Sequence, residues 1–379
     1  MAFLKSFFKW FFIILVLFIG GLYLFNYDYL LKAAINTYGT GHTTAYLDDY
    51  TMSDNRVISG GTPQPWPVHS GYNSAAATPT LEDHNSKWGT VAFLIIKNDS
   101  VWFEKYYEDY DRTTRSNSFS MAKTLVSAML GKAIMEGKIE SLEQPVGDFL
   151  PEFSEGLAAQ LTVGDLSSMS SGLNWDESYY SPFSITTRAY FDDDLRKVML
   201  KLRIVEKPGQ SFKYLSGNTQ LLAMVLEKAT GMHLSDYLSE KFWKPMGAVS
   251  DALWQLDSEE YGMEKAYCCI ASNARDFARF GKLYKDGGKW NSQQLLDPDF
   301  AARSVRPRFA DAPMYGYGLW LSSYEGKEVF YLQGHLGQYV IVIPEDDLII
   351  VRLGHQKSAQ GATSDLETYI RESLIMLKS

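Results

Sequence analysis

An uncharged, apolar run near the amino terminus is the feature that most limits how this chain can fold. Residues 10–25 read WFFIILVLFIGGLYLF, sixteen residues without a charge, and the aromatic character continues to Tyr27. This length approaches the roughly 20 residues that a helix needs to cross a bilayer. Lys5 and Lys9 precede the run and Asp28 follows it. By the positive-inside rule this arrangement predicts a cytoplasmic amino terminus.

A cleaved signal peptide also begins with a short basic stretch and an apolar run. Such a peptide ends in a small-x-small cleavage site, whereas here the bulky residues 26–29, Asn-Tyr-Asp-Tyr, follow the run. The sequence therefore favours an uncleaved anchor. We expect a short cytoplasmic tail at 1–8, a single transmembrane helix at 9–26, and an extracytoplasmic, periplasmic location for the rest of the chain.

The next segment has the composition of a loop. Residues 27–88 are rich in Gly, Thr, Ser, Asn and Pro and lack sustained periodicity, and the stretch 59–67 reads SGGTPQPWP. This chemistry is typical of turns and connections. We therefore predict a tether at 27–88, which Trp66 helps to pack on the domain, and one domain at 89–379.

Strand patterns occur at both ends of this domain, and helical patterns lie in its middle. The β-rich runs 90–97 and 101–107 are separated by Asn-Asp-Ser and predict a hairpin. The end of the chain predicts four strands and a closing helix, at 316–322, 329–333, 338–343, 348–353 and 364–377. An α+β fold follows, with an antiparallel sheet flanked by helices, a helical subdomain, and a cleft at the seam.

Charge and cysteine content bear on partners and cross-links. Acidic residues outnumber basic ones 45 to 36, for a net charge of −9. Nucleic-acid binding needs a dense basic face, so we expect no nucleic-acid partner. Cys268 and Cys269 are adjacent. Neighbouring cysteines fit ordinary disulfide geometry poorly, so we expect two small, half-buried side chains and no cross-linked framework.

The segment SMAK at 120–123 is the first candidate for catalysis. The run 120–136 is apolar on nearly all sides and predicts a buried helix. Residues three apart share a helix face, so Lys123 lies beside Ser120, and apolar surroundings lower the pKa of its amine. A serine hydroxyl needs such a base to act as a nucleophile. The same spacing recurs at 6–9 in the anchor, so the buried helix is what singles out Ser120.

Two further segments supply candidate groups. Tyr214 follows the loop KPGQSFK at 207–213 and precedes a predicted helix at 218–230. A tyrosine near a lysine can relay a proton to a leaving group. The segment GHLGQ at 334–338 opens an apolar strand, and the N–H of Gln338 can serve as an oxyanion donor. Taken alone, Tyr214 is explained equally well as a tyrosine that packs in the core, and the segment 334–338 as the ordinary start of a strand.

Together, the three segments resemble the signature motifs of the serine β-lactamase and penicillin-binding protein superfamily: S-x-x-K, Y-x-N or Y-x-S, and K-T-G or H-x-G. The resemblance covers roughly residues 85–379. LSSMSSGLNW at 166–175 is similar to the superfamily's LLTHTSGL loop, and ARDFARFG at 274–281 to the helix before its sheet. Y-x-S combined with G-H-x-G-Q looks closest to the branch of 6-aminohexanoate-dimer hydrolases and class C-like esterases.

This resemblance implies a role for each matched residue. The nucleophile, its base and the proton relay are Ser120, Lys123 and Tyr214. The other matched positions surround the substrate or the oxyanion: Ser216, His335, Gly337, Gln338 and, loosely, Tyr179. Neither a metal nor a cofactor is implied.

Two departures from the family pattern bear on the substrate. His335 replaces the lysine with which β-lactamases hold the drug's carboxylate, and Ser216 replaces the asparagine of the best β-lactamases. We therefore expect a serine hydrolase that acts through an acyl-enzyme on small ester or amide substrates, and not an efficient penicillin hydrolase.

Other functions have less support in the sequence. A Ser-His-Asp hydrolase needs a G-x-S-x-G elbow, and its nearest match, SMSSG at 168–172, lacks the first glycine. Six scattered histidines show no zinc-ligand spacing. A penicillin-binding or D-peptidase enzyme, or a non-catalytic sensor of cell-wall peptides, remains open on the same fold. A buried lysine is costly unless it is used, which favours catalysis.

Overall fold

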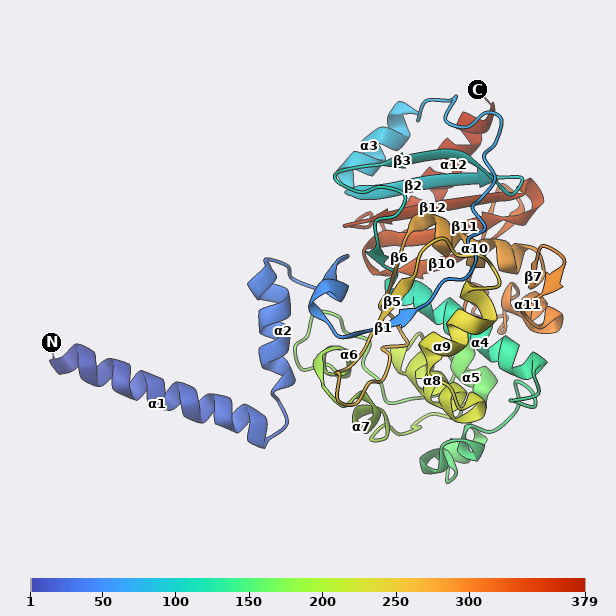
Figure 1. Cartoon of the computed structure of the whole chain (residues 1–379). Coiled ribbons are helices and arrows are strands. Elements are labelled where there is room, and N and C mark those ends of the chain that lie inside the picture. The colour runs from blue at the N-terminus through green and yellow to red at the C-terminus, as the bar shows by residue number, and fades with distance from the viewer. Residues whose placement is uncertain (1, 379) are drawn as a thin grey trace.

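A six-stranded antiparallel sheet, in the order β3-β2-β12-β11-β10-β9, forms one half of the computed structural model, which describes residues 2–378 (Figure 1). Its strands are β2 (Thr90–Lys97), β3 (Ser100–Tyr106), β9 (Trp320–Tyr324), β10 (Lys327–Gly334), β11 (Gln338–Ile343) and β12 (Leu348–Gly354). Two strands come from the start of the domain and four from its end. The prediction that both ends share one sheet is confirmed.

Helices cover both faces of this sheet. α3 (Pro79–Lys87) and α12 (Ala362–Lys378) pack on one face, and α10 (Ala274–Lys285) packs on the other (Figure 1). The central strands β2, β11 and β12 are apolar at almost every position because both of their faces are buried. Gly281 lets α10 approach the sheet closely, since a Cβ there would lie 2.9 Å from Val340 Cγ1.

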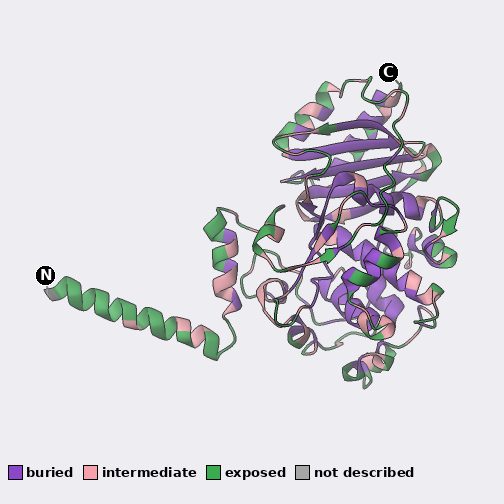
Figure 2. Cartoon of the chain, viewed as in Figure 1, coloured by how far each residue is buried: buried purple, intermediate pink, exposed green. Residues whose placement is uncertain are grey.

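A helical region forms the other half of the domain (Figure 1). Its helices are α4 (Ala122–Met135), α5 (Val163–Ser167), α6 (Ile185–Phe191), α7 (Leu195–Met199), α8 (Ser216–Thr230), α9 (Leu234–Leu238) and α11 (Pro298–Ser304). α4 is buried along most of its length (Figure 2) and packs on α8, α9 and α11. The predicted helix 120–136 is confirmed, except that its first turn is the 3₁₀ helix η3 (Phe119–Met121).

Two small sheets complete the domain. The larger has the antiparallel order β1-β5-β6-β4, from β1 (Asn55–Ile58), β4 (Ser116–Asn117), β5 (Ala252–Gln255) and β6 (Ile270–Ser272). The other pairs β7 (Lys289–Trp290) with β8 (Gln293–Gln294). β4 leads directly into η3, so the first of these sheets fixes where α4 begins.

Residues 27–88, for which the sequence predicts a tether, are more structured than a tether. They contain α2 (Tyr29–Thr37), β1 and α3, and β1 pairs with β5. Trp66 is buried and donates a hydrogen bond of 2.8 Å from Nε1 to the carbonyl oxygen of Arg275. The apolar residues of this segment follow no regular period, because their partners come from distant parts of the chain.

The first of the four carboxy-terminal strands begins later than predicted. β9 starts at Trp320, whereas the sequence suggests a strand from residue 316. Gly318 has a φ of 76°, a left-handed conformation that interrupts an extended chain. At Gly316 a Cβ would lie 2.0 Å from the carbonyl oxygen of Ser304. These glycines therefore form a close-packed turn before the strand.

The amino-terminal apolar run forms the helix α1 (Ala2–Leu24), which projects away from the domain (Figure 1). Most of its residues are exposed (Figure 2). The segment Phe3–Leu24 is long and apolar enough to cross a membrane. The helix begins earlier than the predicted span of 9–26, and its orientation across a bilayer stays a prediction.

Candidate active site

Ser120 lies where the sheet meets the helical region. It belongs to η3, which packs against β10 and β11 and leads into the buried α4. The preceding residue, Phe119, has a φ of 44°, a left-handed conformation that bulky residues rarely adopt. Such strain persists only where the surrounding structure enforces it, and it clusters at functional sites. Ser120 lines a cavity at this junction.

Lys123 is held against Ser120 by its place on the first turn of α4. Its Nζ donates hydrogen bonds to Ser120 Oγ at 2.9 Å and to the carbonyl oxygen of Tyr267 at 2.7 Å. The side chain is buried, and this desolvation lowers the pKa of the amine to about 8, against the opposing charge of Glu177. Roughly a tenth of the lysine is therefore neutral at pH 7, far more than for an amine with the ordinary pKa of 10.5.

Tyr214 is the third residue of the predicted catalytic group, after Ser120 and Lys123. It lies two residues before α8, and its ring centroid is 5.2 Å from Lys123 Nζ. Burial raises the pKa of its hydroxyl, and the contact with the Ser120 hydroxyl acts in the opposite direction. The phenol therefore stays protonated near neutral pH, which suits a group that hands a proton to a leaving atom.

The low pKa of Lys123 predicts the pH dependence of hydrolysis. A base must be neutral, so kcat/KM should rise about tenfold per pH unit below pH 8 and level off above it. Initial rates with p-nitrophenyl butyrate between pH 6 and pH 10 would measure this profile. A flat profile, or a rise that continues without levelling to pH 10, would contradict the role given to Lys123.

Glu177 is a site residue that the sequence did not reveal. Its carboxylate accepts hydrogen bonds of 2.6 Å from the backbone N–H and the hydroxyl of Ser216 and from the hydroxyl of Tyr179. A carboxylate suits this position because Ser216 is the first residue of α8, where unpaired N–H groups attract negative charge. The Ser216 hydroxyl is therefore bonded to Glu177.

Replacing Glu177 with glutamine should move the pH profile to lower pH. The Glu177 charge raises the pKa of Lys123, so its removal lets burial lower that pKa further. The inflection in kcat/KM against pH is the measurement. Asp176→Asn is the matched control, because this neighbouring carboxylate is exposed and should leave the inflection in place. Equal shifts in both variants would show that Glu177 has no special influence on the lysine.

The turn between β10 and β11 holds the remaining predicted residues. His335 stacks on Tyr179 with ring centroids 5.4 Å apart, and burial lowers the pKa of its imidazole to about 4. Gly337 has a φ of 83°, and a Cβ there would lie 2.6 Å from Arg352 Nη1. The buried side chain of Gln338 donates to the carbonyl oxygens of His335 and Gly354, which fixes the start of β11.

One cavity gathers several of these residues. It measures about 820 Å³ when its open mouth and the adjoining solvent are included. Its lining is mostly apolar and combines predicted residues with others that the sequence did not suggest: Ser120, Tyr179, Ser216 and His335, with Phe119, Tyr180, Tyr190, Phe191, Tyr267, Cys268 and residues of the segment 33–45. Lys123 and Tyr214 do not line it.

The prediction that Cys268 and Cys269 are two half-buried side chains without a cross-link is wrong. The structure joins Cys268 to Cys269 by a disulfide, and both side chains are buried. Cys269 has a φ of 76°, so the backbone turns sharply at the bonded pair. The pair directly follows Tyr267, whose carbonyl oxygen accepts the hydrogen bond from Lys123. The cross-link therefore belongs to the turn that holds the lysine.

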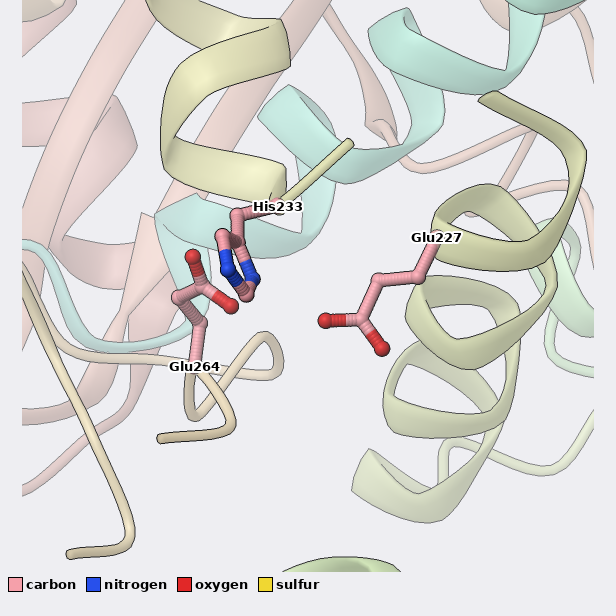
Figure 3. A group of neighbouring side chains, drawn as sticks. All are labelled: Glu227, His233 and Glu264. Carbon is pink, nitrogen blue, oxygen red and sulfur yellow. The ribbon is translucent and has the colours of Figure 1, made fainter. Parts of the chain in front are cut away.

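Glu227, His233 and Glu264 are the one group of possible metal ligands among residues 2–378 (Figure 3). Both carboxylates already have a cationic partner. Glu264 accepts a hydrogen bond of 2.6 Å from Arg56 Nη1, and Glu227 accepts one of 2.7 Å from Arg196 Nη2. A metal ion would be repelled by these guanidinium groups, so the cluster is better explained by ion pairing.

The fold and this site together define a class of protein. An antiparallel sheet is flanked by helices and lies beside a helical region, and a serine–lysine pair stands at the start of the buried helix between them. This is the β-lactamase/transpeptidase-like architecture of serine hydrolases. A family model described as Beta-lactamase matches residues 80–374, and the chain belongs to this family.

Curated relatives and solved structures agree with this assignment. A 6-aminohexanoate-dimer hydrolase from Paenarthrobacter ureafaciens is 28% identical over 225 residues, 56% of each chain. Protein flp of Staphylococcus aureus (strain COL) is 25% identical over 181 residues, 44% of this chain and 36% of its own. The chain therefore spans about half or less of the length of these relatives.

The solved structures share the fold at lower identity. A Bacillus anthracis protein provisionally named a 6-aminohexanoate-dimer hydrolase has a TM-score of 0.72 at 18% identity, with 87% of this chain and 92% of that chain covered. The D-amino acid amidase of Ochrobactrum anthropi has a TM-score of 0.58 at 16% identity, with 78% and 96% covered.

Proposed function

We propose that this hydrolase forms an acyl-enzyme on Ser120 with small ester or amide substrates. The observation that carries the proposal is the 2.9 Å hydrogen bond between Lys123 Nζ and Ser120 Oγ, made by a buried amine whose pKa is lowered to about 8. A buried lysine beside a serine at a cavity wall is a base poised for that hydroxyl.

The proposed reaction has two stages. Neutral Lys123 takes the proton of the Ser120 hydroxyl while Oγ bonds to the substrate carbonyl carbon. The N–H groups of Ser120 and Gln338 bind the oxyanion that forms. Tyr214 relays the proton to the leaving oxygen or nitrogen as its bond to carbon breaks. Water then attacks the acyl-enzyme with the same groups in reverse, which releases the acid and restores Ser120.

The residues around the oxyanion region support esters or amides over β-lactams. His335 stands where the resemblance implies a lysine for the drug's carboxylate, and its imidazole is neutral near pH 7 because its pKa is about 4. The Ser216 hydroxyl is occupied by Glu177. Neither residue offers a positive charge to a substrate carboxylate.

The proposal includes a location. α1 would anchor the chain in a membrane, and Lys5 and Lys9 would hold its amino terminus in the cytoplasm. The hydrolase domain would then face the extracytoplasmic side. A 6-aminohexanoate-dimer hydrolase and a D-amino acid amidase are among the similar proteins, which supports amides as well as esters in the substrate screen.

Fluorophosphonate labelling tests the proposal. The purified full-length chain in detergent should react with the probe, and peptide mass spectrometry should find the adduct on Ser120. Labelling should be blocked in parallel with hydrolysis of p-nitrophenyl butyrate. An adduct on another serine would refute the assignment of Ser120. Cleavage of D-Ala-D-Ala peptides without ester hydrolysis would favour a D-peptidase, and a failure of all three reactions would favour a binding protein.

A further inference from the structure

One wall of the active-site cavity is built by the segment that follows the apolar helix α1. Ala33 and Thr37, one turn apart on the buried face of α2, line the cavity that Ser120 also lines. Thr43, Thr44 and Ala45 continue this wall, and the Thr44 hydroxyl lies 3.2 Å from His335 Nε2. The motifs of the serine hydrolase class do not include this segment.

Polar contacts fix α2 in this position. Lys32 forms an ion pair with Asp193, and the Arg188 guanidinium lies over the ring of Tyr29 at 5.5 Å from its centroid. Arg188 Nη2 also donates to the carbonyl oxygen of Asn26 at 3.2 Å. These contacts join α2 to α6 and to the loop between α6 and α7, so the position of the wall is fixed by the fold.

The connection between α1 and the cavity wall is short. Four residues separate Leu24, the end of α1, from Tyr29, the start of α2. Even fully extended, this link spans no more than roughly 17 Å. If α1 crosses a bilayer, the cavity must therefore lie close to the membrane surface.

The mouth of the cavity is apolar and exposed. Tyr38 and Tyr180 both line the cavity, yet they are 69% and 71% exposed. Phe183, three residues after Tyr180, is 73% exposed. Aromatic residues are enriched at membrane–water interfaces, and exposed apolar residues that gather at one place mark an interaction site.

We propose that the substrate is a membrane-dissolved amphiphile whose acyl chain enters this cavity from the bilayer, past Tyr38 and Tyr180. This inference rests on the proposed acyl-enzyme function and names its substrate class as long-chain acyl esters or amides. The carbonyl carbon reaches Ser120 while the chain lies along the apolar wall of α2. Acyl transfer to Oγ releases the alcohol or amine, and water then releases the fatty acid.

Two vesicle arrangements test the entry route. The full-length chain is reconstituted in phosphatidylcholine vesicles, and p-nitrophenyl palmitate is supplied either in those vesicles or in separate ones. Hydrolysis should be at least tenfold faster when enzyme and ester share a bilayer. Equal rates would overturn entry from the membrane. Hydrolysis of soluble p-nitrophenyl butyrate without hydrolysis of the palmitate would overturn the long-chain substrate and leave the proposed function intact, whereas inertness toward both would refute that function.

A matched pair of variants tests the wall. Ala33→Phe fills the cavity and should lower palmitate hydrolysis at least tenfold more than butyrate hydrolysis. Ala34→Phe places the same ring on the exposed side of α2 and should leave both rates within twofold. If Ala33→Phe lowers the melting temperature, Ala45→Phe on the continuation of the wall gives the same readout. Unchanged palmitate-to-butyrate ratios in stable variants would contradict the proposed acyl site.

In the same assay, acyl length should raise kcat/KM. Burial of each methylene in an apolar wall favours binding by roughly threefold to fourfold, so p-nitrophenyl octanoate should exceed the acetate by well over tenfold. The gain should be smaller in Ala33→Phe. A preference for acetate in the wild-type chain would mean that the acyl group does not occupy this cavity.

Discussion

Alanine at position 120 should abolish ester hydrolysis. We expect kcat for p-nitrophenyl butyrate to fall by about 10⁴-fold or more, because loss of a covalent nucleophile removes the acyl-enzyme pathway and leaves only binding and oxyanion stabilisation. The Ser120 hydroxyl is half-buried, and Lys123 keeps its hydrogen bond to Tyr267 in the variant. The melting temperature should therefore stay close to that of the wild type.

Two serines provide the controls for this experiment. Ser6 stands three residues before Lys9 in α1 and repeats the spacing of Ser120 and Lys123 in a different setting. Ser170 belongs to the segment nearest to a nucleophile elbow, and its buried hydroxyl contacts Ser168 at 3.2 Å. Ser6→Ala and Ser170→Ala should keep kcat within about twofold. Loss of activity in Ser170→Ala, with Ser120→Ala active, would reverse the assignment.

The sequence predicts well those parts of the fold in which one segment determines its own environment. The run 120–136 is apolar on nearly all sides, and the helix that it forms is buried along most of its length. The run 348–353 likewise becomes β12, a strand with both faces covered. In these segments a run of consecutive apolar residues is enough to indicate that the element is buried on all sides.

Parts that depend on partners from distant segments could not be predicted. β1 is short and half-exposed, and it gains its regularity from pairing with β5, almost 200 residues later. Ala33 and Thr37 are unremarkable in sequence and become cavity residues only because α2 packs on α6. A pattern search within one segment cannot detect either relation.

The same distinction applies to the site. Ser120 and Lys123 are three residues apart, so helix geometry alone brings them together. Glu177 reaches Ser216 from a loop 39 residues earlier, and its only local signal is an acidic residue after the segment 166–175. The Cys268–Cys269 disulfide was excluded on general geometry, yet a sharp turn with a positive φ at Cys269 accommodates it.

Methionine at position 123 should separate catalysis from stability. Methionine matches the lysine side chain as far as Cε but has no amine, so we expect kcat to fall by about 10³-fold or more. At pH 7 the folded state is penalised for burying an amine whose pKa falls from 10.5 to about 8. This penalty is about 3 kcal/mol below pH 8 and disappears as the pH rises toward 10.5.

The variant should therefore be no less stable than the wild type at pH 7, because removal of the desolvation penalty offsets the loss of the hydrogen bonds to Ser120 and Tyr267. Urea unfolding at pH 7 and pH 10 would measure this, and the wild type should gain stability relative to the variant at the higher pH, where its penalty disappears. A large loss of stability in Lys123→Met would instead indicate a structural role.

Lys265→Met is the matched control, because Lys265 is also buried with a pKa lowered to about 8 but lies apart from Ser120, in a cavity with Asp49 and Asp257. These two carboxylates favour the charged form of Lys265, whereas Lys123 has Glu177 alone in that role. The control should lose stability as its carboxylates lose their cation, yet its folded fraction should keep hydrolysing p-nitrophenyl butyrate. Inactivation of both variants to the same degree would mean that burial of a lysine, and not its place beside Ser120, explains the effect.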